Sequence, residues 1–302
     1  MKRIATIFCL VLLFANTASA TMPKGQNQEE QKYFINVGNL HMMISENGGK
    51  ILSLKYDETE VISQLRWPES FGSTFWTSPQ REWNWPPVSE FDKQPYTVEQ
   101  NDDEIVITSQ PSSRLGLQVS KKFMTDKQRK AIVITYSIKN VTDTIRSVAP
   151  WEITRVPNSG LIFFDASKES ISPANLLPFQ FAHNAAWYQA DAINENRKIN
   201  ADGKGWLAYA NNGLLLVKQF TDLDASQPAP GEAEVQVYVN RGTTYIELES
   251  QGAYTALNPG QQLSWTVCWY LLPCNAENQP SQSLLDLVRR VLSKENISSI
   301  LP

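Results

Sequence analysis

Two carboxylates placed two positions apart mark the clearest potential for chemistry in this sequence. Glu247 and Glu249 lie in the run Tyr245–Gln251, which has the letters YIELESQ. Side chains alternate between the two faces of a strand, so both carboxylates share one face if this run is a strand. Glu249 lies close to the strand end, where a side chain can project into a cleft. There it could act as a general base, since partial burial brings a carboxyl pKa near working pH. Alternatively, both carboxylates are ordinary outward-facing strand residues.

The second candidate feature is an aromatic segment, Phe71–Pro87, which contains Trp76, Trp83, Trp85 and Arg81. Aromatic faces stack on the C–H faces of sugar rings, and an arginine donates hydrogen bonds to ring hydroxyls. Loops also carry a large share of binding residues. The segment therefore predicts a saccharide-binding loop. Alternatively, its tryptophans cover the open end of a β-sandwich.

The third candidate feature is the pair Trp151 and Glu152. Trp151 could serve as a stacking platform, and Glu152 could serve as an acid if burial raised its pKa. His183, in an aromatic context, is another candidate acid, whereas His41 lies in a strand-like run and is expected to be structural. Two distant histidines and no paired-cysteine motif argue against a zinc site, so neither a metal nor a cofactor is expected.

The order of motifs near the C-terminus resembles that of the galactose mutarotase (aldose 1-epimerase) superfamily. There an L-E-T-Q carboxylate motif is followed by a Pro-Gly turn and a last core strand, as Leu248–Gln251 is followed by Pro259 here. The resemblance implies that Glu249 is the catalytic base. Trp76–Arg81 is similar to the superfamily's xxFPxxxR pocket loop, which implies that Arg81 is the pocket arginine.

Two further segments bear on the resemblance. Tyr136–Thr142 is similar to a YxIxNxT run of that superfamily, after which its members carry a histidine as general acid. Here Trp151 and Glu152 stand in that region instead. The whole chain resembles a secreted branch typed as DUF4380, on the segments GGKILSLKY, WTSPQREW, APWEITRV, YIELESQG and LNPGQQLSWTVCWYL.

The elements that must position these groups have the pattern of a β protein. Short runs rich in β-branched and aromatic residues recur between turn signals, for example Ala131–Ile138 and Val235–Val239. Only Ser281–Lys294 has helical spacing of its apolar residues. The pattern predicts an all-β antiparallel sandwich. The resemblance implies a galactose mutarotase-like β-supersandwich over residues 32–275, with a C-terminal helical cap at 276–302.

The N-terminus has the features of a secretory signal peptide. A basic start, an apolar run and the small-residue end Ala18-Ser19-Ala20 predict cleavage after residue 20. Residues 21–31 are expected to form a flexible lead. The mature protein is expected to be secreted, in the periplasm of a Gram-negative source. No later apolar run has membrane-spanning length, so membrane insertion is not expected.

Charge and cysteine content narrow the classes of partner. Removing Lys2 and Arg3 reduces the 27 basic residues to 25, against 31 acidic residues. An acidic chain without a basic patch argues against nucleic acid as a partner. Six residues of extended chain place Cys268 and Cys274 roughly 20 Å apart, far beyond the roughly 6 Å between Cα atoms that a disulfide needs. Only a sharp fold at Pro273 could bring them together, so free thiols are expected.

Together these features predict a secreted carbohydrate-binding protein, its mono- or oligosaccharide held in a cleft lined by aromatics, Arg81 and Glu249. An aldose 1-epimerase with Glu249 as base and Glu152 or His183 as acid is the alternative. A structural envelope protein, whose tryptophans bury a partner surface, is the third. Neither the sugar nor the oligomeric state follows from the sequence.

Overall fold

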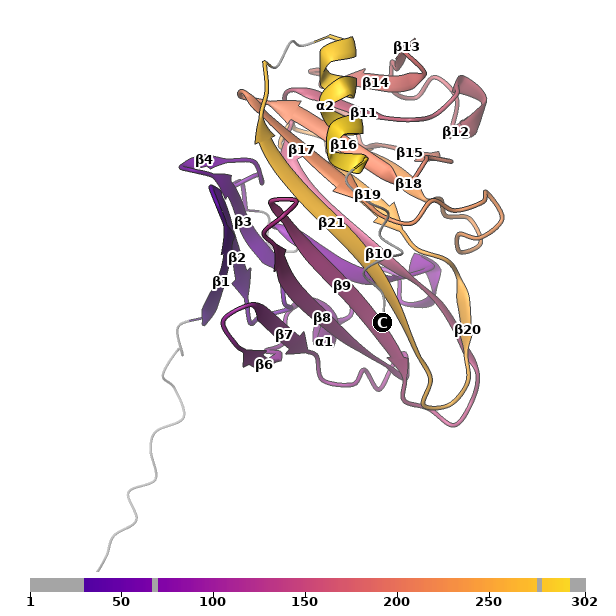
Figure 1. The fold of residues 1–302 in the computed structure, drawn as a ribbon. Coiled ribbons are helices and arrows are strands. Elements are labelled where there is room, and N and C mark those ends of the chain that lie inside the picture. Colours follow the sequence, from indigo (N-terminus) through magenta and orange to yellow (C-terminus); the bar gives the residue numbers. More distant parts are fainter. Residues whose placement is uncertain (1–29, 67–69, 276–278, 294–302) are drawn as a thin grey trace, which may run out of the picture.

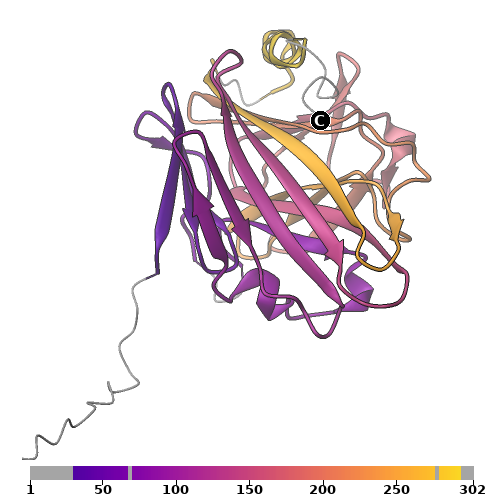
Figure 2. The ribbon, with the colours of Figure 1, turned by 60° about the horizontal axis from the view of Figure 1, so that its bottom comes forward.

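A computed structural model describes residues 30–66, 70–275 and 279–293 of the chain. Within these residues, two large antiparallel sheets pack face to face (Figures 1 and 2). The predicted all-β supersandwich with a C-terminal helix is thereby confirmed. The predicted signal peptide, most of the predicted flexible lead and the last nine residues lie outside the described part.

The first sheet has eleven strands, and its central path carries the site described below. Along that path the strands are β1 (Lys32–Val37), β2 (Leu40–Ser45), β3 (Ile51–Tyr56), β5 (Ser73–Ser78), β10 (Arg146–Pro157), β19 (Tyr245–Gln251), β18 (Val235–Val239), β15 (Arg197–Ala201) and β12 (Ile171–Ser172). Two short strands lie off the path, β4 (Thr59–Glu60) beside β3 and β20 (Thr255–Leu257) beside β10.

The second sheet has ten strands and covers one face of the first. Its order is β13 (Gln180–Ala182), β14 (Ala185–Gln189), β11 (Leu161–Phe164), β16 (Trp206–Asn211), β17 (Leu214–Gln219), β21 (Gln262–Pro273), β9 (Ala131–Asn140), β8 (Leu117–Asp126), β7 (Glu104–Thr108) and β6 (Thr97–Gln100). The helical elements are η1 (Gln80–Glu82), α1 (Ser89–Asp92), η2 (Lys168–Ser170) and α2 (Gln282–Leu292).

Apolar residues gather in two layers, because each sheet directs alternate side chains to opposite faces. The larger cluster fills the space between the sheets and includes Phe75 of β5, Leu248 of β19 and Ile134 of β9. A smaller cluster lies where α2 covers the outer face of the second sheet, with Leu284 and Val288 packed against its strands (Figure 1). The helix predicted near the C-terminus therefore exists and is held by its apolar stripe.

Local differences from the sequence predictions are small. The segment Tyr245–Leu272, expected to form two strands, forms three, because β20 pairs with the first residues of β10. Cys268 and Cys274 are free thiols, as predicted. No helix in the described part of the chain is both long and apolar enough to cross a membrane.

Candidate functional site

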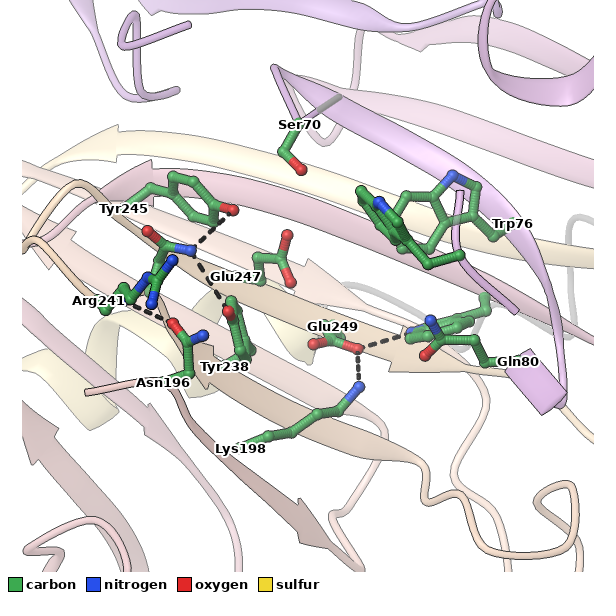
Figure 3. Close-up of a pocket in the computed structure, with 13 residues that line it drawn as sticks. Ser70, Trp76, Gln80, Asn196, Lys198, Tyr238, Arg241, Tyr245, Glu247 and Glu249 are labelled. Carbon is green, nitrogen blue, oxygen red and sulfur yellow. Dashed lines mark hydrogen bonds and ion pairs between the residues drawn. The ribbon is translucent and has the colours of Figure 1, made fainter. Parts of the chain in front are cut away.

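A cavity of about 600 Å³ lies on the face of the first sheet that points away from the second sheet. Ligand pockets in proteins fall in this size range. Figure 3 shows how the lining side chains point into it from several strands. The lining residues are Ser70, Trp76, Gln80, Trp85, Trp151, Asn196, Lys198, Tyr238, Asn240, Arg241, Tyr245, Glu247 and Glu249.

Strand register explains why these side chains meet. On β19 the odd-numbered residues Glu247 and Glu249 face the cavity, as their spacing predicts. Glu247 stands opposite Tyr238 of β18, which in turn stands opposite Lys198 of β15. These residues are far apart in the sequence, but antiparallel pairing puts them in one row across the sheet.

Glu249 lies at the centre of the cavity and is only 1% exposed. Its Oε2 atom accepts hydrogen bonds from Trp151 Nε1 at 2.8 Å and from Lys198 Nζ at 2.9 Å. Both hydrogen bonds are accepted by Oε2, and no described residue donates a hydrogen bond to Oε1. The second oxygen thus remains available to a ligand hydroxyl.

Glu247 has a different environment two positions away. Arg155 Nη2 lies 2.9 Å from its Oε1 atom, and the arginine is itself only 2% exposed. Burial raises the pKa of Glu247, and the charge of Arg155 offsets that effect only in part. A carboxyl group whose pKa is raised binds a proton more readily than a free one, and in its protonated form it can donate as well as accept a hydrogen bond.

Three of the tryptophans predicted to bind sugar line one end of the cavity. The rings of Trp76 and Trp151 pack edge to face at 5.4 Å, and those of Trp76 and Trp85 at 6.2 Å. Trp85 is 53% exposed, so much of its surface is open. Trp83 is buried and does not line the cavity, because its ring supports Trp76 from behind at 5.4 Å.

A buried carboxylate fixes the orientation of this aromatic group. Asp92 Oδ1 accepts hydrogen bonds from Trp76 Nε1 at 2.9 Å and from Thr74 Oγ1 at 2.7 Å. Its other oxygen is ion-paired with Lys50 at 3.0 Å. These partners lower the pKa of Asp92, although burial alone would raise it. The tryptophan is thus held in place before any ligand arrives.

The opposite end of the cavity is polar. Asn240 Nδ2 donates to the phenol oxygens of Tyr238 at 3.3 Å and of Tyr245 at 3.2 Å. The backbone N–H of Arg241 donates to Asn196 Oδ1 at 2.8 Å. Amides, phenols and a guanidinium together offer both donors and acceptors to a hydroxyl-rich ligand.

Glu152, predicted as an acid, lies outside this cavity. It is adjacent to Trp151 in β10 and therefore points to the opposite face, into the core between the sheets. There its Oε1 atom is 2.5 Å from Lys218 Nζ, and both side chains are fully buried. Tyr136 Oη also donates to its Oε2 at 2.9 Å. A ligand in the cavity cannot reach it, so the predicted acid role does not fit this structure.

Arg81 and His183 also lie away from the cavity. Arg81 is exposed on η1, and its neighbour Gln80 lines the cavity instead. His183 follows β13 and lines a separate hollow with Asp165 and Lys204. Of the predicted site residues, the structure thus brings Glu249, Trp76, Trp85 and Trp151 together in the cavity and leaves Glu152, His183 and Arg81 away from it. Trp83 packs against Trp76 but does not line the cavity.

The sequence analysis did not identify the polar half of the site. Lys198 lies on β15, in the run RKINA, where polar Lys198 and Asn200 alternate with apolar Ile199 and Ala201. That alternation was the available signal, but five residues give it weakly. Asn240 and Arg241 lie in a turn, and their place in the cavity depends on pairing between distant strands. Among the described residues, no group of three or more His, Cys, Asp or Glu side chains could hold a metal ion.

Comparisons with known proteins establish the fold. No family model and no curated protein matches the sequence. Among solved structures, a galactose mutarotase-like protein from Lactobacillus casei matches with a TM-score of 0.54 and 12% identity, over 80% of this chain and 100% of that one. A galactose mutarotase-like protein from Clostridium acetobutylicum gives 0.53 and 11%, over 82% and 96%. The galactose 1-epimerase from Lactobacillus acidophilus gives 0.50 and 11%, over 81% and 99%.

Proposed function

Starting from the galactose mutarotase-like fold of this chain, we propose that the protein binds a saccharide in the cavity around Glu249. The observation that carries the proposal is the two-sided lining: three tryptophans at one end, amides, phenols and a guanidinium at the other, and Glu249 with Lys198 between them. Sugars present C–H faces that stack on aromatic rings and hydroxyls that both donate and accept hydrogen bonds. The signal peptide predicted from the sequence adds a location outside the cytoplasm to this proposal.

Glu249→Gln is expected to weaken saccharide binding by about 10- to 100-fold, since a hydrogen bond to a charged group contributes about 1.5–3 kcal/mol. The substitution preserves the shape of the side chain but removes its charge. Titration calorimetry of the wild type and the variant against a panel of mono- and oligosaccharides measures the effect.

Arg81→Ala is the matched control, because Arg81 is exposed and lies outside the cavity lining. We expect its affinity to stay within about twofold of wild type, as is usual for surface changes. Equal affinities of Glu249→Gln and wild type would remove Glu249 from the binding site. If the wild type binds no saccharide at all, the structural envelope role becomes the better explanation.

The second candidate function, an aldose 1-epimerase, is favoured by the two carboxylates of β19. Enzymes assign acid and base roles to paired groups whose environments differ. Both carboxylates are ion-paired here, Glu249 with Lys198 and Glu247 with Arg155, but burial still raises the pKa of Glu247. Oε1 of Glu249 would take the proton from the anomeric hydroxyl while Glu247 protonates the ring oxygen. The bond between the anomeric carbon and the ring oxygen then breaks, and reclosure on the other face gives the other anomer.

If the protein is an epimerase, the wild type should equilibrate a freshly dissolved single anomer faster than buffer alone does. Glu249→Gln and Glu247→Gln should each lower the enzymatic rate by about 100-fold or more, because general acid–base catalysis contributes at least that factor. One-dimensional NMR of the anomeric proton measures the exchange. A wild-type rate equal to that of buffer, for every sugar that binds, would leave a binding protein only.

A further inference from the structure

The cavity is larger than one sugar ring. Its lining runs from Tyr245 to Glu249 along β19 and continues past Glu249 to Trp76 and Trp85. The four residues of strand from Tyr245 to Glu249 alone correspond to roughly 13 Å at about 3.3 Å per residue. A single pyranose ring with its hydroxyls is shorter than this row and fills only part of the cavity volume of about 600 Å³. One ring therefore leaves part of the lining facing water.

The two ends of the cavity suit different parts of a ligand. At the aromatic end, Trp76 and Trp85 offer ring surface, and Gln80 is the amide beside them. Figure 3 shows Trp76 and Gln80 together on one side, well apart from Tyr245 and Arg241 on the other. The aromatic end favours the apolar face of a ring, since stacking on tryptophan needs a C–H surface.

The polar end is built before a ligand arrives. Asn240 fixes two phenol groups at once, and Asn196 fixes the backbone of Arg241. Because these groups are already held by one another, they lose little freedom when a ligand binds. They form a second subsite that recognises ring hydroxyls through hydrogen bonds.

Glu249 and Lys198 lie between the two ends, as Figure 3 shows. Lys198 Nζ is 2.9 Å from Glu249 Oε2 and 4.7 Å from the centre of the Trp151 ring. This pair joins the two subsites into one continuous lining, with the free Oε1 of Glu249 at its middle.

We infer that the cavity takes an oligosaccharide of at least two rings, one stacked at the tryptophan end and one hydrogen-bonded at the Asn240 end, with the linkage beside Glu249. The inference rests on the proposed saccharide-binding function and specifies its ligand class.

The test uses titration calorimetry of the full mature protein with homologous series of one, two and three rings built on glucose, galactose and mannose. We expect a two- or three-ring member to bind at least about tenfold more tightly than its single ring, since one further stacking or charged contact contributes about 1.4 kcal/mol. Trp85→Ala and Arg241→Ala should each weaken the longer ligand by about tenfold. A single ring occupies one of the two subsites, so only one of the two variants should weaken its binding.

Phe34→Ala and Arg290→Ala are the controls, because both side chains are exposed and neither lines the cavity. Thermal unfolding of every variant confirms that it is folded. The inference is overturned if longer ligands bind no more tightly than single rings. It is also overturned if one cavity variant leaves the longer ligand unaffected, or if both weaken single rings and longer ligands equally. Absence of binding throughout the series counts instead against the proposed function itself.

Discussion

Replacing Glu152 by glutamine is expected to lower the free energy of unfolding by about 3–5 kcal/mol, the usual cost of breaking a buried ion pair from one side. Glu152 and Lys218 are both fully buried between the sheets. Lys218 Nζ also donates to Thr154 Oγ1 at 3.1 Å and to the backbone carbonyl of Leu248 at 3.2 Å. Without the carboxylate, its charge would stay in the core without a counter-charge. Urea unfolding of the two proteins at neutral pH measures the loss.

The double variant Glu152→Gln/Lys218→Met separates the ion pair from the rest of the network. Removing both charges is expected to recover most of the lost stability, because no uncompensated charge then remains. The double variant should also bind saccharide as wild type does, since both residues lie on the face opposite the cavity. A single variant that loses less than about 1 kcal/mol would show that the pair contributes little. Lost binding in a stable double variant would connect Glu152 to the site after all.

Raising the pH from about 7 to 9 is expected to stabilise the wild type relative to Lys121→Met. Lys121 of β8 is 1% exposed and donates to the carbonyls of Gly48 at 3.0 Å and Gly49 at 2.7 Å. Burial lowers the pKa of Lys121 from 10.5 to about 7. Between these values the unfolded chain binds the proton and the folded chain does not, so stability rises with pH by up to about 1.4 kcal/mol per unit. Below pH 7 Lys121 is charged in both the folded and the unfolded chain, so the folded chain bears the full cost of burying the ammonium group.

Urea unfolding of wild type and Lys121→Met at pH 7, 8 and 9 tests this sign. Other groups also titrate in that window, but they are common to both proteins and cancel in the difference. Nearby Asp92 opposes the lowered pKa of Lys121, whereas Lys50 reinforces it. A constant difference between the two proteins from pH 7 to 9 would show that Lys121 keeps its proton when folded.

Much of the fold was accessible from the sequence because it depends on local patterns. The Val235–Val239 run alternates in the sequence and forms β18 with the same limits. The helix near the C-terminus follows from its apolar spacing, and its packing against the second sheet is consistent with that stripe. Glu249 and the tryptophans could be identified for a similar reason, since their chemistry is recognisable without knowing their neighbours.

The rest of the site depends on which face each strand presents. Trp151 and Glu152 are adjacent in the sequence, but one contacts Glu249 and the other contacts Lys218 across the core. Only the pairing of β10 with its neighbours decides which residue faces the cavity. Lys198 was missed for the same reason, because its partner Glu249 lies 51 positions away along the chain.

The alternation along β19 separates two kinds of evolutionary change. Substitutions at Tyr245, Glu247 or Glu249 alter the lining of the cavity, whereas substitutions at Ile246 or Leu248 alter the interface between the sheets. Selection on the cavity can therefore act on one half of the strand while selection on folding acts on the other. This gives a physical route by which proteins with as little as 11% identity keep one architecture.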